Sequence, residues 1–169
     1  MSGYRKILPW SRFRPVMGPL PVESWFRVPG LLRFGCPWPW QVAESSSLLH
    51  PDGDHDDTAV LATLEAPRSH GRARLLVWLE PNPVDLTRDP APGLEQLYQG
   101  RAVETRAVLL DGRRAVAVEV DAPGARRVAR LVADSGRGDP VHAELDVPRA
   151  SAQGYRPHWD TMLATWQWL

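Results

Sequence analysis

The stretch from Tyr155 to Leu169, YRPHWDTMLATWQWL, constrains the fold of this chain more than any other. Five large apolar residues recur there at the spacing of one helical face: Trp159, Met162, Leu163, Trp166 and Leu169. Pro157 falls where a first-turn proline is tolerated, and Asp160 places negative charge near the positive end of the helix dipole. Each large side chain contributes roughly 2–3 kcal/mol once it is buried. Because the residues upstream are typical of β-strands, we expect this helix to cover a sheet.

The strand patterns upstream predict an antiparallel meander. Valine-rich runs stand on both sides of Asp111-Gly112 in residues 103–120, and an Asp-Gly pair in this setting is a strong hairpin signal. A second strand pair is predicted for residues 126–133 and 141–147, with His142 on the polar, exposed face of the last strand. Residues 73–80 are apolar nearly throughout and predict a central strand, and residues 59–65 predict a further strand.

Two further elements complete the expected fold. Phe26 to Phe34 predicts a first strand that turns at Pro29-Gly30 and leads into a corner of tryptophan and proline. Residues 86–99, followed by Gly100, predict a short helix. We therefore expect an α+β fold, an antiparallel meander covered by a C-terminal helix and one shorter helix, in a single domain over residues 25–169.

Residues 1–24 predict an extended arm, because four prolines fix the backbone and remove hydrogen-bond donors. The arm is too rich in aromatic and aliphatic residues for a purely solvated tail. We expect it to bind a partner, either a second copy of this chain or a different protein. The predicted partner-binding residues are Tyr4, Trp10, Arg12, Phe13 and Arg14. In the alternative interpretation, the arm only covers the apolar surface of its own domain.

The composition argues against several classes of protein. The formal net charge is zero, so no overall field favours nucleic acid or an anionic membrane. The single cysteine, Cys36, excludes an intramolecular disulfide. We find neither a secretory signal pattern nor an apolar run long enough to span a membrane. The sequence thus favours a cytoplasmic protein without nucleic-acid binding or membrane insertion.

Metal and catalytic chemistry depend on two weak candidates. The loop from His50 to Asp57 holds two histidines and four aspartates, but its spacing departs from a calcium loop at Asp57 and Thr63. Cys36 has no catalytic signature around it, and a packed thiol is the better expectation. We find no nucleophile elbow, zinc-protease motif or phosphate-binding loop. We therefore expect no cofactor, no metal and no enzymatic activity.

Three segments give the chain a resemblance to the PsbP-like α/β sandwich superfamily. Residues 26–40, FRVPGLLRFGCPWPW, look like the family's opening corner, and residues 110–115, LDGRRA, are similar to its hairpin. The end of the chain, from Tyr155 through Trp166 to Trp168, looks like its closing helix. The resemblance extends over about residues 25–169. It implies an α/β/α sandwich and a largely non-catalytic binding role, as in photosystem extrinsic proteins, a Ran-binding import factor, LpqN-type lipoproteins and Eag-type effector chaperones of secretion systems.

The sequence as a whole favours a non-enzymatic protein-interaction module. Such a module would act as a bacterial, secretion-associated adaptor, a chaperone-like binder or a subunit of a complex, and would hold a protein or peptide through its arm and sheet. Lacking a lipidation signal, the chain departs from the lipoprotein members and is closer to the cytoplasmic binders. Two other classes remain as alternatives. One is a metal-dependent or cysteine hydrolase, and the other is a carrier of a small apolar ligand between helix and sheet.

Overall fold

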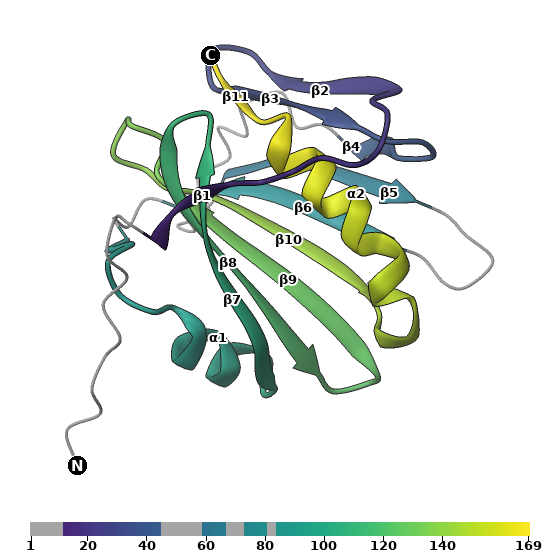
Figure 1. Ribbon diagram of the computed structural model, residues 1–169, viewed down its shortest axis with the longest axis vertical. Helices are drawn as coiled ribbons and strands as arrows, with labels where there is room; N and C mark the ends of the chain where they lie inside the picture. Colours follow the sequence, from purple (N-terminus) through teal and green to yellow (C-terminus); the bar gives the residue numbers. More distant parts are fainter. Residues whose placement is uncertain (1–11, 45–58, 67–72, 81–83) are drawn as a thin grey trace.

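The computed structural model describes residues 12–44, 59–66, 73–80 and 84–169, which form two sheets and two α-helices (Figure 1). The strands are β1 (Arg14–Pro15), β2 (Ser24–Val28), β3 (Leu32–Cys36), β4 (Gln41–Glu44), β5 (Ala59–Ala66), β6 (Ala73–Leu79), β7 (Arg101–Leu110), β8 (Arg113–Ala122), β9 (Arg126–Ala133), β10 (Val141–Pro148) and β11 (Gln167–Trp168). The helices are α1 (Ala91–Tyr98) and α2 (Ala152–Ala164), the latter after a short 3-10 turn at Arg149–Ser151. None of the helices within these ranges is both long enough and apolar enough to cross a membrane.

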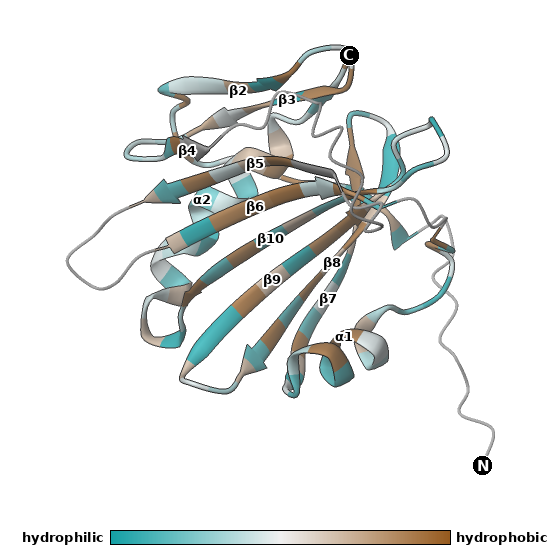
Figure 2. Ribbon diagram, turned by 180° about the vertical axis from the view of Figure 1, so that it is seen from behind, coloured by the Kyte–Doolittle hydropathy of each residue, from teal (hydrophilic) through white to brown (hydrophobic). Residues whose placement is uncertain are grey.

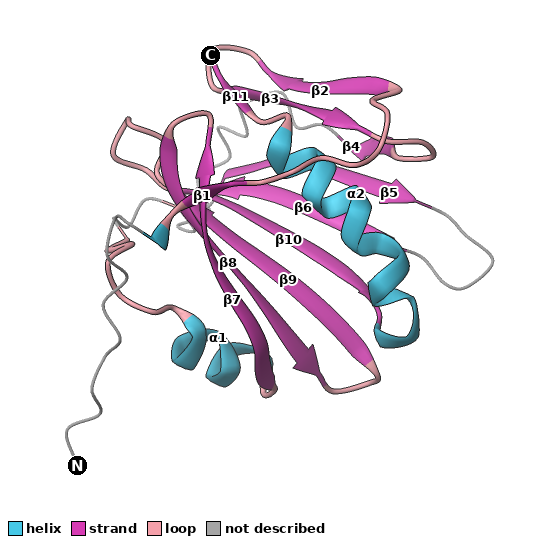
Figure 3. Cartoon of the chain, viewed as in Figure 1, coloured by secondary structure: helices cyan, strands magenta, loops and turns pink. Residues whose placement is uncertain are grey.

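The larger sheet contains eight strands in the order β1-β7-β8-β9-β10-β6-β5-β4 (Figure 3). All of its pairings are antiparallel except the short pairing of β1 with β7. Asp111 and Gly112 join β7 to β8 with φ angles of 47° and 80°, the left-handed pair that a tight two-residue hairpin requires. The predicted meander is thereby confirmed.

The sheet carries a helix on each face. Helix α2 and the small sheet β11-β3-β2 cover one face, where Trp159, Met162 and Leu163 are buried against β5, β6, β9 and β10. Helix α1 lies on the other face and buries Leu94 against the valines of β8. Apolar and polar residues alternate along β10, as the colours of Figure 2 show. The expected α+β fold with one C-terminal and one shorter helix is confirmed.

The C-terminal helix begins at Ala152, before the predicted start at Tyr155, and it ends at Ala164, before the predicted end at Leu169. Pro157 therefore lies inside the helix and not in its first turn. The Thr165 hydroxyl donates to the Thr161 carbonyl oxygen (2.7 Å) near this end, and the backbone then turns extended. Gln167 and Trp168 form β11 against β3, so Leu169 is not on the buried helical face and is 40% exposed.

The predicted first strand is in fact a hairpin in a separate sheet. Strands β2 and β3 pair around the Pro29-Gly30 turn, and β11 pairs with the other edge of β3. The Phe34 ring stacks on Trp166 at 5.3 Å between centroids, which ties this sheet to the end of α2. Trp40, after the tryptophan-proline corner, is buried and donates from its indole nitrogen to His158 Nδ1 (3.1 Å).

The short helix begins later than predicted, at Ala91 after Pro90. The Asp89 carboxylate accepts the Ala91 N–H (2.9 Å) and supplies one of the partners that a helix start requires. A Cβ atom on Gly100, just beyond the helix, would stand 2.2 Å from the Asp121 carbonyl oxygen. Glycine is therefore required where α1 leads into β7.

Candidate functional site

The described part of the arm crosses the edge of the large sheet. Arg14 and Pro15 form β1 and pair in parallel with Val108 and Leu109 of the edge strand β7. Phe13, immediately before β1, is 3% exposed and packs in the apolar cluster between α1 and β8. Residues after β1 pack on the opposite face. The arm is thus anchored on one face of the sheet before β1 and on the opposite face after β1.

After β1 the arm is seated on α2 and the small sheet. The Leu20 N–H donates to Thr161 Oγ1 (3.1 Å). A Cβ atom on Gly18 would stand 2.9 Å from the Ala164 Cβ, so the arm approaches α2 as closely as only glycine permits. Val22 lies directly over Gly35 of β3. These contacts hold residues 18–22 in one place along the helix.

The structure separates the predicted partner-binding residues into three groups. Phe13 is buried in its own domain, so it anchors the arm and is not an exposed contact. Arg12 and Arg14 are exposed. Tyr4 and Trp10 lie outside the described residues. The described part of the arm therefore covers its own domain, as the alternative interpretation expects, while partner binding through the arm stays a prediction.

A groove of about 610 Å³ lies between the arm, the outer edge of β7 and α2. It is lined by Arg12, Arg14, Pro15, Val16, Met17, Thr105, Arg106, Ala107, Val108 and Asp160. Three arginines and one aspartate leave its lining with two net positive charges. Met17 is 84% exposed at its rim. A hollow of about 420 Å³ lies where Pro15 and Val16 meet the end of α2. The groove combines apolar area, positive charge and a strand edge.

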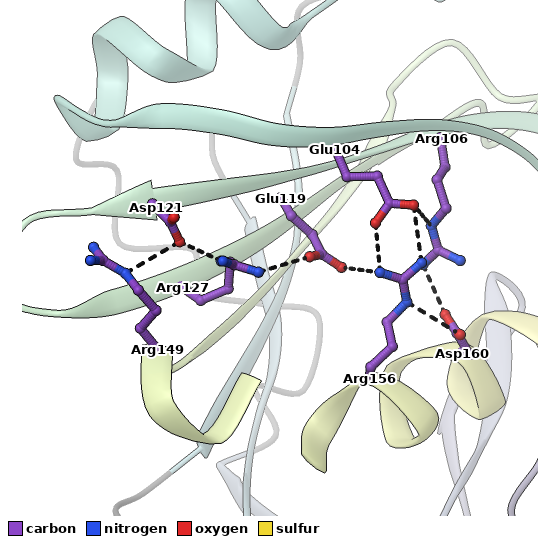
Figure 4. A network of polar contacts seen from close by, with 8 residues as sticks. All are labelled: Glu104, Arg106, Glu119, Asp121, Arg127, Arg149, Arg156 and Asp160. Atoms are coloured by element: carbon purple, nitrogen blue, oxygen red, sulfur yellow. Dashed lines mark hydrogen bonds and ion pairs between the residues drawn. The ribbon is translucent and has the colours of Figure 1, made fainter. Parts of the chain in front are cut away.

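Ion pairs fix the α2 wall of this groove (Figure 4). Arg156 of α2 reaches Glu104 of β7 (2.6 Å) and Glu119 of β8 (2.9 Å). Arg106 of β7 reaches Asp160 of α2 (2.8 Å). Hydrogen bonding to Glu104, together with the nearby charges of Glu119 and Asp160, raises the pKa of Arg156, and hydrogen bonding from Arg156 lowers the pKa of Glu104. Arg156 and Glu104 therefore remain charged near neutral pH, and the ion pairs hold α2 against the sheet.

The same network continues away from the groove through Arg127, which lies between Glu119 and Asp121. Arg149 contacts Asp121 (3.3 Å) and donates to the Ala122 carbonyl oxygen (2.9 Å). Figure 4 shows four arginines interleaved with four carboxylates, so the network has no net charge. Its arrangement suits a structural role, because each charge already has a partner of opposite sign.

A second polar cluster lies on the α1 face of the sheet. Arg130 of β9 stacks over Trp78 (4.3 Å to the ring centroid) and donates to Tyr98 of α1 (2.8 Å). Its NH2 group lies 3.1 Å from His142 Nδ1, and the His142 ring stacks on Trp78. Glu144 accepts the Tyr98 hydroxyl. The sequence predicts an exposed His142, but Trp78 and Arg130 cover it and it is buried.

The protonation states in this cluster do not suit acid–base catalysis. Burial, reinforced by the Arg130 charge, lowers the pKa of His142 to about 4, so the ring is neutral at pH 7. Burial also raises the pKa of Tyr98 far above its ordinary value. The cluster contributes contacts between β6, β9, β10 and α1, and we assign it to the stability of the fold.

The remaining sequence candidates are resolved in different ways. Burial raises the pKa of the Cys36 thiol to about 11, so this cysteine is a packed thiol and not an activated nucleophile. The loop from His50 to Asp57 lies outside the described residues. Within the described ranges, no three His, Cys, Asp or Glu side chains are grouped as metal ligands require. The cavity between α2 and the sheet near Trp159 has about 20 Å³, room for one water but not for an apolar ligand.

Sequence reasoning missed the edge of β7 as part of a site. Thr105, Arg106 and Val108 were recognisable as residues of a hairpin strand. Their place on an edge depends on which strand lies beside them, and β1 is only two residues long. A two-residue strand carries no periodicity, so the sequence offered no signal for this pairing.

Comparison with known proteins identifies the fold. No family model matches the sequence, and no curated protein matches it significantly. The solution structure of cyanobacterial PsbP (CyanoP) from Synechocystis sp. PCC 6803 is similar with a TM-score of 0.58 and 13% sequence identity, over 90% of this chain and 97% of that one. The likeness to LpqN-type and Eag-type members stays a prediction. The described chain has a PsbP-like fold.

Proposed function

We propose that this protein is a non-enzymatic protein-interaction module that binds its partner in the groove between the arm and β7. The observation that carries the proposal is the groove itself, about 610 Å³ with exposed arginines and Met17 at its rim. Arginine and methionine are enriched in protein interfaces, where charged contacts surround a small apolar centre. Its role would be that of an adaptor or chaperone-like subunit of an assembly.

The shape and lining of the groove favour a polypeptide over a small molecule. Small-molecule sites enclose most of their ligand. Here one wall is the open edge of a strand, and Arg12, Arg14 and Met17 are all exposed. The described titratable clusters offer no activated nucleophile, since the Cys36 thiol is buried and His142 is held neutral. These features support a binding role.

Site-specific crosslinking in cells of the native host tests the proposal. A photo-crosslinking amino acid replaces Met17, which is 84% exposed at the groove, and in a control protein replaces Leu97, which is 61% exposed on α1. We expect a discrete crosslinked protein from position 17 that is missing from position 97. Equal labelling at both positions, or none at position 17, would refute the proposal.

Matched arginine variants sharpen the test. Arg12→Ser with Arg14→Ser removes the exposed charges of the groove, and Arg27→Ser with Arg74→Ser removes two exposed charges on β2 and β6. We expect the first pair to reduce crosslinking from position 17 at least fivefold and the second pair to leave it unchanged. The mass of the purified protein in solution shows whether the crosslinked partner is a second copy of this chain.

A further inference from the structure

Among the described residues, most of the outer edge of β7 has no neighbouring strand. On its inner side β7 pairs with β8 along its length, from Arg101 opposite Asp121 to Leu110 opposite Arg113. On its outer side, β1 pairs only with Val108 and Leu109. In the part of the chain that the structure describes, no other strand adjoins this side of β7. The strand before Val108 therefore presents backbone N–H and C=O groups outward.

Natural sheets protect such edges, because unpaired backbone groups invite the pairing of another chain. In β7 the register shifts between Ala102 and Glu104, a bulge that ends regular geometry at that point. From Glu104 to Ala107 the register is regular again. This stretch of four residues spans about 13 Å, and three residues from Thr105 to Ala107 line the groove. An incoming strand would find a regular edge directly before the position of β1.

The charges beside this edge select the chemistry of the occupant. Arg106 contacts Asp160, and Arg12 and Arg14 add positive charge at the exposed rim. Carboxylates of an added strand would lie near these guanidinium groups and form charge-assisted hydrogen bonds with them. A second copy of this chain would instead bring two sets of Arg12 and Arg14 close to one another, which is unfavourable. Charge complementarity thus favours an acidic segment of another protein.

We propose that residues 104–107 of β7 accept an extended, acidic segment of a partner protein as an added strand, with Arg12 and Arg14 contacting its carboxylates. This proposal rests on the proposed function and adds to it the conformation and charge of the partner. Backbone hydrogen bonds to β7 supply affinity that does not depend on the partner's sequence, and the arginines supply selectivity.

The test begins with selection from a display library of random twelve-residue linear peptides on the intact protein. We expect enrichment of Asp and Glu over the starting library, and loss of that enrichment when the selection uses Arg12→Ser with Arg14→Ser. Arg12→Glu with Arg14→Glu should instead enrich Lys and Arg. No enrichment over an unrelated control protein, or the same enrichment with all variants, would overturn the proposal. Urea melts establish that each variant is folded.

The strand-addition step is tested with the most enriched peptide. Bound peptide should slow amide hydrogen exchange within residues 104–107 at least tenfold. Methylating alternate backbone nitrogens of the peptide, on the set that faces β7, should weaken binding at least tenfold, while methylating the other set should have little effect. Equal binding of both methylated peptides, or exchange unchanged at β7, would show a charge contact without strand addition and refute this inference. Crosslinking from position 17 could still succeed in that case, so the two proposals fail separately. Dimerisation of the protein through the same amides would also overturn it.

Discussion

Replacing Phe13 with alanine tests whether the arm is part of the folded domain. The Phe13 ring is 3% exposed and packs among Leu94, Val116 and Val118. Truncation of a buried phenylalanine to alanine costs about 3–5 kcal/mol, a large share of the 5–15 kcal/mol that stabilises a typical domain. For a chain of this length we expect the melting temperature to fall by roughly 6–20 °C.

The free energy that holds the arm on the domain limits the loss of stability that Phe13→Ala can cause. If the arm can detach while the rest of the domain stays folded, the measured loss cannot exceed the free energy that holds the arm in place. Amide hydrogen exchange at Val108 and Leu109 of β7 distinguishes detachment of the arm from unfolding of the whole domain. Detachment would expose these two residues while the remainder of the sheet stays folded.

Urea unfolding, followed by tryptophan fluorescence and circular dichroism, measures the loss. Met17→Ala is the matched control, since Met17 belongs to the same arm but is 84% exposed. It should change the free energy of unfolding by less than about 0.5 kcal/mol. A Phe13→Ala protein as stable as the control would refute the packing of the arm and would show that the Phe13 contact is dispensable for folding.

Three further outcomes follow from the titratable groups. Contact with Arg156 lowers the pKa of Glu104 below its unfolded value, so the ionised Glu104 carboxylate stabilises the folded protein. This stabilisation is present above about pH 4.3 and is lost as the pH falls through the folded pKa. Arg156→Gln should therefore flatten the decline of the urea unfolding midpoint measured from pH 6 to pH 3. Burial lowers the pKa of His142 to about 4, so its ring should not titrate near pH 6.5 in NMR spectra. Because the unfolded chain takes up this proton first, His142 should lower the free energy of unfolding as the pH falls from about 6.5 to 4. Arg130→Met should raise the pKa of His142, because it removes the neighbouring positive charge. With its pKa raised to about 11, the Cys36 thiol should react with a disulfide reagent at pH 8 at least a hundredfold more slowly in the native protein than in urea, and equal rates would contradict its burial.

Residues with strong periodicity were the ones whose structure could be predicted. Alternation identified β10, and Asp111-Gly112 identified the hairpin of β7 and β8, because local backbone preferences decide both. The end of the C-terminal helix could not be predicted in this way. Trp166 and Leu169 continue the apolar pattern, but pairing with β3 draws Gln167 and Trp168 into a strand, and that partner lies far away in the sequence.

The candidate site was predictable only in part. Arg12 and Arg14 were proposed from the composition of the arm, and both are exposed beside the groove. Phe13 lies between them in sequence, yet it is buried, because its ring packs in the apolar cluster between α1 and β8. His142 was misjudged for a related reason: its neighbours on the exposed face, Trp78 and Arg130, come from other strands.

The pairing of β3 with β11 also governs when the protein can fold during its synthesis. Arg33 and Gln167, which face each other in this pairing, are 134 residues apart in the chain. At roughly 5–20 residues per second, a ribosome needs about 7–27 s to make the segment between them. For most of that interval β2 and β3 lack α2, and throughout it they lack the strand that completes their sheet. The buried face of Phe26 and Phe34 therefore stays uncovered on the nascent chain, and a slower ribosome would lengthen its exposure to aggregation.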